Sequence, residues 1–219
     1  MNKLFRMDSP LMEGLTRIGD LLCLSVLWLV FSLPIFTIGA SSAALYNTVY
    51  HCLRRNRTGV WQRFWNAFQE NFKRSTLAWL IELGILAVLL VDISVFRTIK
   101  QSGGFMGNLY WAALFVGAVA ITWTAYVAAY SARVNGTVKD VLRYGFLLLR
   151  LHPIKALGVM IPILVGMAMC LMVPTMLMLV PAAVCWVYSF TIEQVFRMHM
   201  QPEDLEKENA LDALDKENN

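Results

Sequence analysis

The sequence predicts an all-α, polytopic membrane helix bundle with about five spans and two amphipathic interfacial helices. Three observations predict this class. Hydrophobic residues make up 58% of the 219 residues and charged residues only 16%, a balance that would leave large apolar patches exposed on a water-soluble domain of this size. The apolar residues gather in stretches of about 20, the length at which a helix crosses a bilayer. The charged residues lie between these stretches, so we expect a single transmembrane domain over residues 1–199.

Five stretches have the length and composition of membrane spans. The last two meet at Val173 and Pro174, where the proline disfavours helix in the preceding residue, so we expect a tight hairpin there. Pro162 and Pro181 fall inside spans and are expected to kink them. The predicted spans cover residues 20–46, 77–96, 109–130, 155–173 and 174–192.

The first span contains helix-breaking residues in the segment SLPIFTIGASSAALY, residues 32–46. The nearly uncharged run from Gly19 to Leu53 is about twice as long as one crossing requires. It therefore crosses once with a kink, which we favour, or folds back at Pro34 as a re-entrant hairpin. In both arrangements its small residues offer a surface on which another helix can approach closely. This partner or packing motif comprises Pro34, Thr37, Gly39, Ala40 and Ala43.

The loop after the first span is strongly basic. Its sequence HCLRRNRTGVWQRFWNAFQENFKRST has six Lys and Arg against one acid, Glu70, so the positive-inside rule places it in the cytoplasm. Aromatic residues recur in it at helical spacing, which predicts an amphipathic helix near 58–74 in the inner headgroup layer. Packing of the same stripe on the protein's own helices is the alternative. The predicted interfacial or lipid contacts are Arg54, Arg55, Arg57, Trp61, Arg63, Trp65, Phe68, Phe72, Lys73 and Arg74.

A second basic loop, SARVNGTVKDVLRYGFLLLRLHP, repeats this design and predicts an interfacial helix near 137–151. With both basic loops inside, we expect a multi-pass protein of the cell membrane with its C-terminus in the cytoplasm and its N-terminus outside. The tail over residues 200–219 is polar and acidic and is expected to be disordered.

Two stretches of the chain resemble a known family. LWLVFSLPIFTIGASSAALY and, after the basic loop, WNAFQENFKRSTLAWLI are similar to the signature of the YesL-like family of bacterial integral membrane proteins, whose function is unassigned. A weaker likeness extends through YSARVNGTVKDVLRYGFLLLRLHP and PAAVCWVYSFTIEQVF. The family often has an asparagine where this chain has Ser25. Its members tend to be encoded beside carbohydrate-uptake transporters and sugar-responsive two-component systems, so the resemblance implies an accessory role in sugar uptake or sensing.

Glu82 and Asp92 are the acids within the second span, and ionisable groups inside a membrane are candidates for function. Because both are predicted near the ends of the span, we expect local pairing or snorkelling. The sequence contains no catalytic triad order, paired-acid motif, metalloprotease motif or phosphate-binding glycine loop, so an enzyme is not expected. The four cysteines and three histidines are dispersed, which predicts neither a metal site nor a cofactor.

We therefore expect a non-catalytic accessory partner, in contact with the lipid bilayer, of a sugar ABC transporter or of a sensor kinase. The alternative is a small transporter or channel, which would require a homo-oligomer because five spans make a narrow pathway. The broken first span, the intramembrane acids and a weak parallel repeat of the span and basic-helix pattern motivate that alternative. Nucleic-acid binding is not indicated, because the basic stretches adjoin membrane spans and the net charge of +4 follows from membrane topology.

Overall fold

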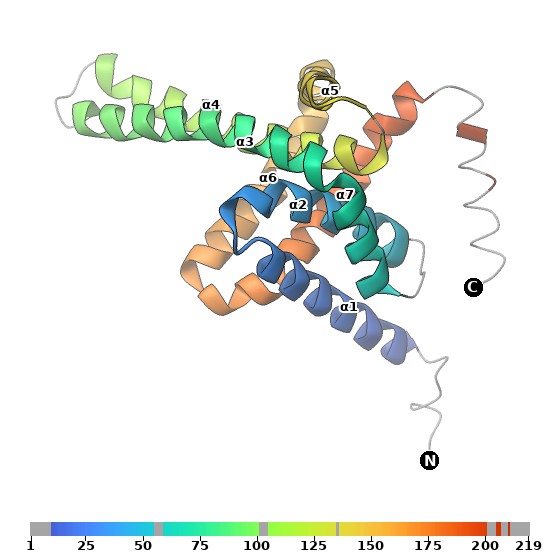
Figure 1. The fold of residues 1–219 in the computed structure, drawn as a ribbon. Coiled ribbons are helices and arrows are strands. Elements are labelled where there is room, and N and C mark those ends of the chain that lie inside the picture. The colour runs from blue at the N-terminus through green and yellow to red at the C-terminus, as the bar shows by residue number, and fades with distance from the viewer. Residues whose placement is uncertain are drawn as a thin grey trace.

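The computed structural model describes residues 10–54, 59–100, 105–134, 136–200, 205–206 and 210, and within them all regular secondary structure is helical. This confirms the predicted all-α fold (Figure 1). Short 3-10 helices over Ile35–Thr37 and Pro174–Met178 precede α2 and α7, and a π-helical turn over Val49–Leu53 extends α2. The seven α-helices of the described residues are α1 (Pro10–Phe31), α2 (Ile38–Thr48), α3 (Val60–Lys100), α4 (Phe105–Arg133), α5 (Val138–Leu151), α6 (Pro153–Met172) and α7 (Val180–His199).

Four helices in the described residues are long and apolar enough to cross a membrane, within Gly14–Phe31, Val60–Thr98, Asn108–Arg133 and Pro153–Met172. The protein is accordingly a membrane protein. The predicted fifth span over 174–192 is not among them. The 3-10 helix takes up its first residues, and α7 then continues to charged residues at Glu193 and Arg197. Pro181 lies in the first turn of α7, where proline is compatible with helix, so it does not kink a span.

The first span differs from the favoured prediction because the chain folds back at Pro34. In a continuous helix, Trp28 and Ser42 would be about 21 Å apart along the axis, yet Trp28 Nε1 donates a hydrogen bond of 3.1 Å to Ser42 Oγ. The hydroxyls of Ser32 and Ser41 lie 2.6 Å apart across the same turn. The Thr37 hydroxyl donates a hydrogen bond of 2.6 Å to the Phe31 carbonyl oxygen across the same turn. The helix-breaking residues therefore serve to turn α2 back along α1, and a single kinked span over 20–46 is wrong.

The basic loop and the second span also differ from prediction, because they form one continuous helix, α3, of 41 residues. Gly59, with a φ of +92°, precedes it in the left-handed region that favours glycine. Residues 60–83 contain no glycine or proline that would end the helix. An interfacial helix near 58–74 is therefore not a separate element.

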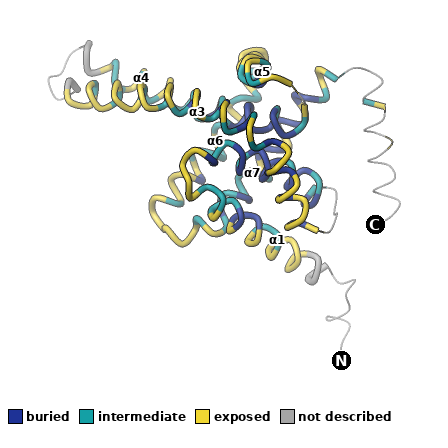
Figure 2. Tube along the Cα trace, viewed as in Figure 1, coloured by how far each residue is buried: buried dark blue, intermediate teal, exposed yellow. Residues whose placement is uncertain are grey.

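The second half of α3 pairs with the first half of α4 as a long hairpin that projects from the rest of the protein (Figure 1). Figure 2 shows in yellow that much of its surface is exposed. Many of these exposed residues are large and apolar. The side chains of Val88, Val91 and Phe115, for example, are each about three-fifths exposed. We call residues 80–98 and 108–120 the α3–α4 hairpin.

The core is centred on α2, which contacts α1, α3, α4 and α7. Ala40, Ala43, Ala44 and Tyr46 of α2 are fully buried, and Figure 2 shows the same concentration of buried residues in the middle of the body. A helix of small side chains permits close approach by its neighbours, which explains why so short a helix can sit among four others.

The helix α5 occupies the residues expected for the second amphipathic helix. It begins with a capping box, in which Thr137 and Asp140 satisfy each other's backbone N–H groups. After α5, α6 and α7 form an antiparallel hairpin, with Val173 extended before Pro174 as predicted. Apart from Met200 and three helical residues, the acidic tail over residues 200–219, predicted to be disordered, lies outside the described residues.

Candidate functional site

Two glutamates are buried within the described part of the chain, and their surroundings are opposite. Glu193 of α7 is 1% exposed and Glu82 of α3 is 2% exposed. A carboxylate removed from water is costly unless a partner compensates its charge. Whether each glutamate has such partners therefore distinguishes a structural site from a candidate binding site.

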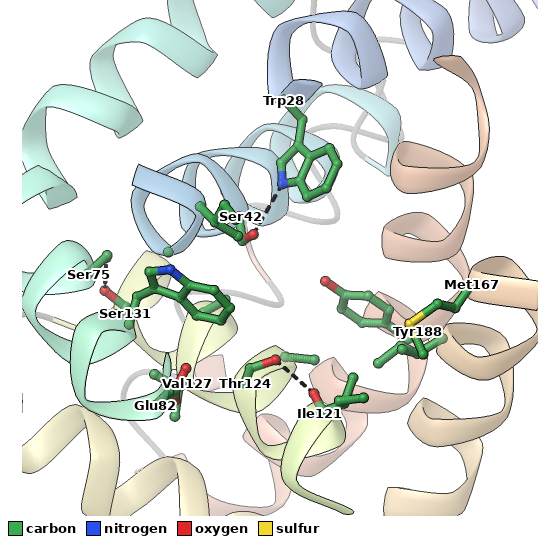
Figure 3. A pocket seen from close by; sticks show the side chains of 16 residues that line it. Trp28, Ser42, Ser75, Glu82, Ile121, Thr124, Val127, Ser131, Met167 and Tyr188 are labelled. Carbon is green, nitrogen blue, oxygen red and sulfur yellow. Dashed lines mark hydrogen bonds between the residues drawn. The ribbon is translucent and has the colours of Figure 1, made fainter. Parts of the chain in front are cut away.

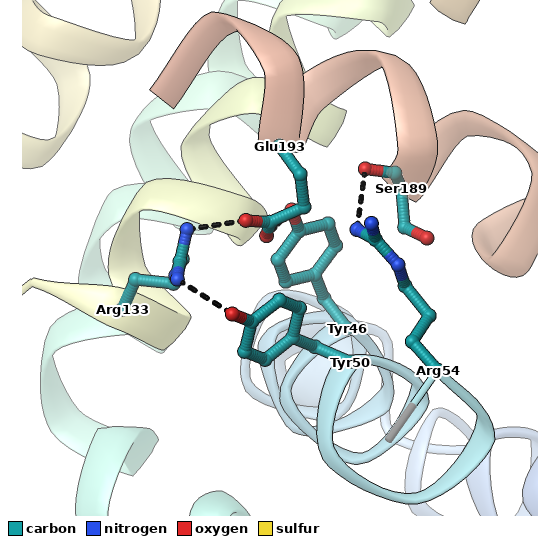
Figure 4. Close-up of polar contacts among 6 residues, drawn as sticks. All are labelled: Tyr46, Tyr50, Arg54, Arg133, Ser189 and Glu193. Atoms are coloured by element: carbon teal, nitrogen blue, oxygen red, sulfur yellow. Dashed lines mark hydrogen bonds and ion pairs between the residues drawn. The ribbon is translucent and has the colours of Figure 1, made fainter. Parts of the chain in front are cut away.

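Glu193 lies in a polar cluster that joins α2, α4 and α7 (Figure 4). Arg133, the last residue of α4, forms an ion pair with its Oε2 atom. The Tyr46 hydroxyl donates a hydrogen bond of 2.6 Å to its Oε1 atom. Arg133 also donates to the Tyr50 hydroxyl at 3.0 Å, and its guanidinium lies 4.5 Å from the centre of that ring. Both oxygens of Glu193 are therefore paired, which indicates a structural role.

Arg54 extends this cluster to the end of α2. Its Nη1 atom donates to the Ser189 carbonyl oxygen at 3.3 Å, and its guanidinium lies 4.6 Å from the centre of the Phe190 ring. The C-terminal ends of α2 and α4 thus meet on α7. The described ends of the two basic loops consequently lie together at one end of the protein.

Glu82 instead lines a cavity of about 370 Å³. Its Oε1 atom is buried and has no hydrogen-bond partner within the described residues. Figure 3 shows the carboxylate at the cavity beside residues of α4, with Trp28 and Tyr188 on other sides. Helices α1, α2, α3, α4, α6 and α7 all contribute to the walls.

The fold-back at Pro34 builds one wall of the cavity. It places Gly39 so close to α3 that an added Cβ would lie 2.4 Å from Trp79 Cβ and 2.5 Å from the Ser75 carbonyl oxygen. Trp79 Nε1 donates to the Ile35 carbonyl oxygen at 2.8 Å, which fixes the indole against the turn. Only glycine fits at this contact, so the packing of α2 on α3 depends on it.

The motif predicted over residues 34–43 lies mostly inside the protein. Thr37, Ala40 and Ala43 are buried, Gly39 is half-buried, and Pro34 is exposed at the turn. The small residues Gly39, Ala40 and Ala43 therefore pack chiefly against the protein's own helices.

The residues predicted as interfacial contacts divide between surface and interior. Trp61, Arg63, Trp65 and Lys73 are exposed. Phe68 is buried, with its ring centre 5.1 Å from that of Phe31, and Phe72 is half-buried beside it. The aromatic stripe thus packs in part on the protein itself.

The basic residues of the same prediction also differ in their surroundings. Arg74 is half-buried and donates hydrogen bonds of 2.5 Å to Asn71 Oδ1 and to the Ser131 carbonyl oxygen. Arg63 donates to Asn47 Oδ1 at 2.9 Å. Arg55 and Arg57 lie outside the described residues. Arg74 therefore belongs to the packing of α3 on α4.

The two predicted intramembrane acids are far from equivalent. Asp92 is exposed on the α3–α4 hairpin, whereas Glu82 is buried at the cavity. The local pairing or snorkelling expected for Glu82 does not occur at its Oε1 atom. Sequence reasoning missed Arg133 and Glu193. The sequence did offer a signal for this pair: Arg133 and Glu193 are opposite charges that each lie toward the end of a largely apolar helix.

Among the described residues no group of three His, Cys, Asp or Glu side chains is placed to hold a metal ion. None of the four cysteines forms a disulfide within the described residues. The arrangement at Glu82 is thus one carboxylate in a largely apolar cavity, which suits binding more than covalent chemistry.

Residues 21–93 match the model of a family described as "Protein of unknown function, DUF624". The matched segment includes the fold-back at Pro34, the packing of α2 on α3, and Glu82. No curated protein and no solved structure matches the chain. The resemblance to the YesL-like proteins, the known group of this family, is confirmed. Over residues 21–93, the chain is therefore similar to the DUF624 family of proteins of unknown function.

Proposed function

We propose that this protein is a non-catalytic membrane subunit that docks through the α3–α4 hairpin on a carbohydrate-uptake transporter or a sugar-sensing kinase. The observation that carries the proposal is the hairpin itself. Its two helices leave the body of the protein, and their outward apolar surfaces are not covered by the chain's other described helices. The genetic association implied by the resemblance to YesL-like proteins supplies the class of partner.

One face of the hairpin favours close contact with another helix. Gly84 and Ala87 are exposed on α3, followed by Val88 and Val91 one turn further along. A Cβ added at Gly84 would meet no atom within 4 Å. Within a membrane, lipid covers apolar surface as well as protein does, so helix association depends on close packing at small residues. The docking surface proposed here is therefore residues 84–91, in place of the buried motif at 34–43.

The replacement Gly84→Leu tests this surface directly, because the chain itself leaves room for the larger side chain. The tagged protein is purified from the membranes of cells grown on a polysaccharide. We expect the amount of transporter or kinase recovered with it to fall about tenfold. Gly19→Leu is the matched control, since Gly19 is also an exposed helical glycine with open space around it. Equal recovery with both variants would contradict the proposal.

A small transporter or channel is a second candidate, and the buried Glu82 at a cavity favours it. Ionisable residues that face cavities mark substrate paths in many transporters. Flux of sugars or ions into liposomes that contain the purified protein tests this function. We expect the flux to disappear in Glu82→Gln and to persist in Asp92→Asn; an absence of flux in the wild type would remove the candidate.

We also propose that the end of the protein bearing Arg54 and Arg133 faces the cytoplasm. Both residues adjoin basic loops and both approach Tyr50, with their guanidinium carbons 5.6 and 4.5 Å from its ring centre. The positive-inside rule favours retention of such loops on the cytoplasmic side. Single cysteines at residues 62 and 136, in a background without the natural cysteines, should react with a membrane-impermeant maleimide only after the cells are permeabilised.

A further inference from the structure

We propose that the cavity at Glu82 is a binding site for a small organic ammonium ion. Glu82 would supply the negative charge opposite the ammonium group, and the apolar and aromatic walls would enclose its carbon substituents. This inference goes beyond both functions proposed above, because it requires neither a docked partner nor movement of the ligand across the membrane.

The charge of the ligand follows from the environment of Glu82. The side chain is 2% exposed, and its Oε1 atom has no partner in the described part of the chain. The other buried glutamate, Glu193, has an arginine and a tyrosine on its two oxygens. A cation in the cavity would give Glu82 the compensation that Glu193 obtains from Arg133.

The size of the cavity fits a molecule rather than a single ion or water. Its volume is about 370 Å³, within the usual range for small-molecule sites, whereas a water molecule occupies about 30 Å³ in the liquid. A bare metal ion would need several further oxygen or nitrogen ligands. Among the described residues that line the cavity, Glu82 is the only acidic one.

The walls favour an ammonium ion with apolar substituents over a polyhydroxylated ligand. Many of the lining side chains are aliphatic, including Ile121, Ile163 and Met167, and Trp28, Trp79 and Tyr188 add aromatic surface. Aromatic rings attract organic cations, and such attraction strengthens where water is excluded. A sugar, by contrast, would bring several hydroxyls into a cavity with few polar groups to receive them.

Most of the hydroxyls that line the cavity already have partners within the protein. Ser75 and Ser131 share a hydrogen bond of 2.5 Å, and the Thr124 hydroxyl donates to the Ile121 carbonyl oxygen at 2.7 Å. Ser42 accepts from Trp28 at 3.1 Å. The carboxylate of Glu82 is therefore the principal polar group available to a ligand.

Choline and its neutral isostere 3,3-dimethylbutan-1-ol provide a direct test, because the two differ chiefly by the charge on one atom. Binding is measured by isothermal titration calorimetry on the purified full-length protein in a nonionic maltoside detergent, which contains no ammonium group. We expect choline to bind at one saturable site and the isostere to bind at least about tenfold more weakly.

Two variants assign the binding to the cavity. Glu82→Gln keeps the shape of the side chain and removes its charge, so choline affinity should fall at least about tenfold. Asp92→Asn removes an exposed carboxylate on the same helix and should leave the affinity unchanged. The absence of saturable choline binding, equal affinity for the isostere, or wild-type affinity in Glu82→Gln would each overturn the proposal. If Glu82→Gln fails to fold, the comparison of choline with its isostere on the wild type decides the question.

Discussion

Arg133 at the end of α4 is paired in the protein interior with Glu193 of α7, and Tyr46 of α2 holds the second oxygen of the same carboxylate. Removing one member of such a buried pair leaves the other charge without compensation, a loss of about 3–5 kcal/mol. We expect Glu193→Gln and Arg133→Gln each to lower the melting temperature markedly in detergent. The double variant should be more stable than the sum of the two losses implies. Additive losses in this double-mutant cycle would show that the two residues do not act as a pair.

Replacement of Gly39 by alanine tests the close contact between α2 and α3. The added Cβ would overlap the backbone carbonyl oxygen of Ser75 and the Cβ of Trp79, neither of which can rotate away. We expect a loss of about 1–3 kcal/mol, measured by thermal unfolding in detergent. Gly84→Ala is the control, since that position is open and alanine is the better helix former. Equal melting temperatures for both variants would rule out the tight contact.

Ser25 connects α1 to the start of α7, and its removal should weaken that contact. Its hydroxyl donates to the Leu179 carbonyl oxygen at 3.0 Å and accepts from the Ala182 N–H at 3.1 Å. Ser25→Ala leaves the buried Ala182 N–H and the half-buried Leu179 carbonyl without this partner, so we expect a loss of about 1–3 kcal/mol. Ser94→Ala removes a hydroxyl on the exposed hairpin and should cost far less. The measurement is the melting temperature of each variant in the same detergent.

Ser25→Asn extends this test to the residue that the resemblance to YesL-like proteins implies at this position. An asparagine side chain also carries a donor and an acceptor, so we expect it to retain more stability than alanine does. A melting temperature for Ser25→Asn below that of Ser25→Ala would show that the two residue types are not interchangeable at this position.

The start of α5 should depend on pH through Asp140. Hydrogen bonds from the Thr137 hydroxyl and backbone N–H, at 2.7 and 3.0 Å, hold the pKa of this carboxyl below its usual range. The unfolded chain therefore binds the proton more readily than the folded one, so the stabilisation is present above about pH 4. It is lost as the pH falls through the lower pKa of the folded state. Amide hydrogen exchange of residues 138–141 should accelerate over that interval, relative to the intrinsic rate, in the wild type but not in Asp140→Asn.

Composition and the lengths of the apolar stretches were sufficient to predict the helical membrane fold. Local signals also placed the ends of several helices: Val173 and Pro174 separate α6 from the segment before α7, and the second amphipathic helix occupies the expected residues. These features depend on neighbours in sequence, which is why sequence alone was enough.

The features that sequence did not predict depend on contacts between distant segments. The break at Pro34 is compatible with a kink or with a turn, and only the contacts of Trp28 with Ser42 and of Ser32 with Ser41 distinguish them. Likewise, the pairing of Glu193 but not of Glu82 follows from which helices meet at each side chain. Charge patterning identified Glu82 as an intramembrane acid but could not show that it faces a cavity.

The most direct test of the central claim is site-specific photo-crosslinking from Val88, at the centre of the proposed docking surface. A photoreactive phenylalanine analogue replaces Val88 in one strain and Leu171, a still more exposed apolar residue at the end of α6, in another. After irradiation of intact cells grown on a polysaccharide, mass spectrometry identifies the proteins joined to each. We predict that Val88 joins to a membrane subunit of a sugar transporter or to a sensor kinase, and that Leu171 does not. Crosslinks from Val88 to lipid alone, in cells that express those partners, would contradict the account.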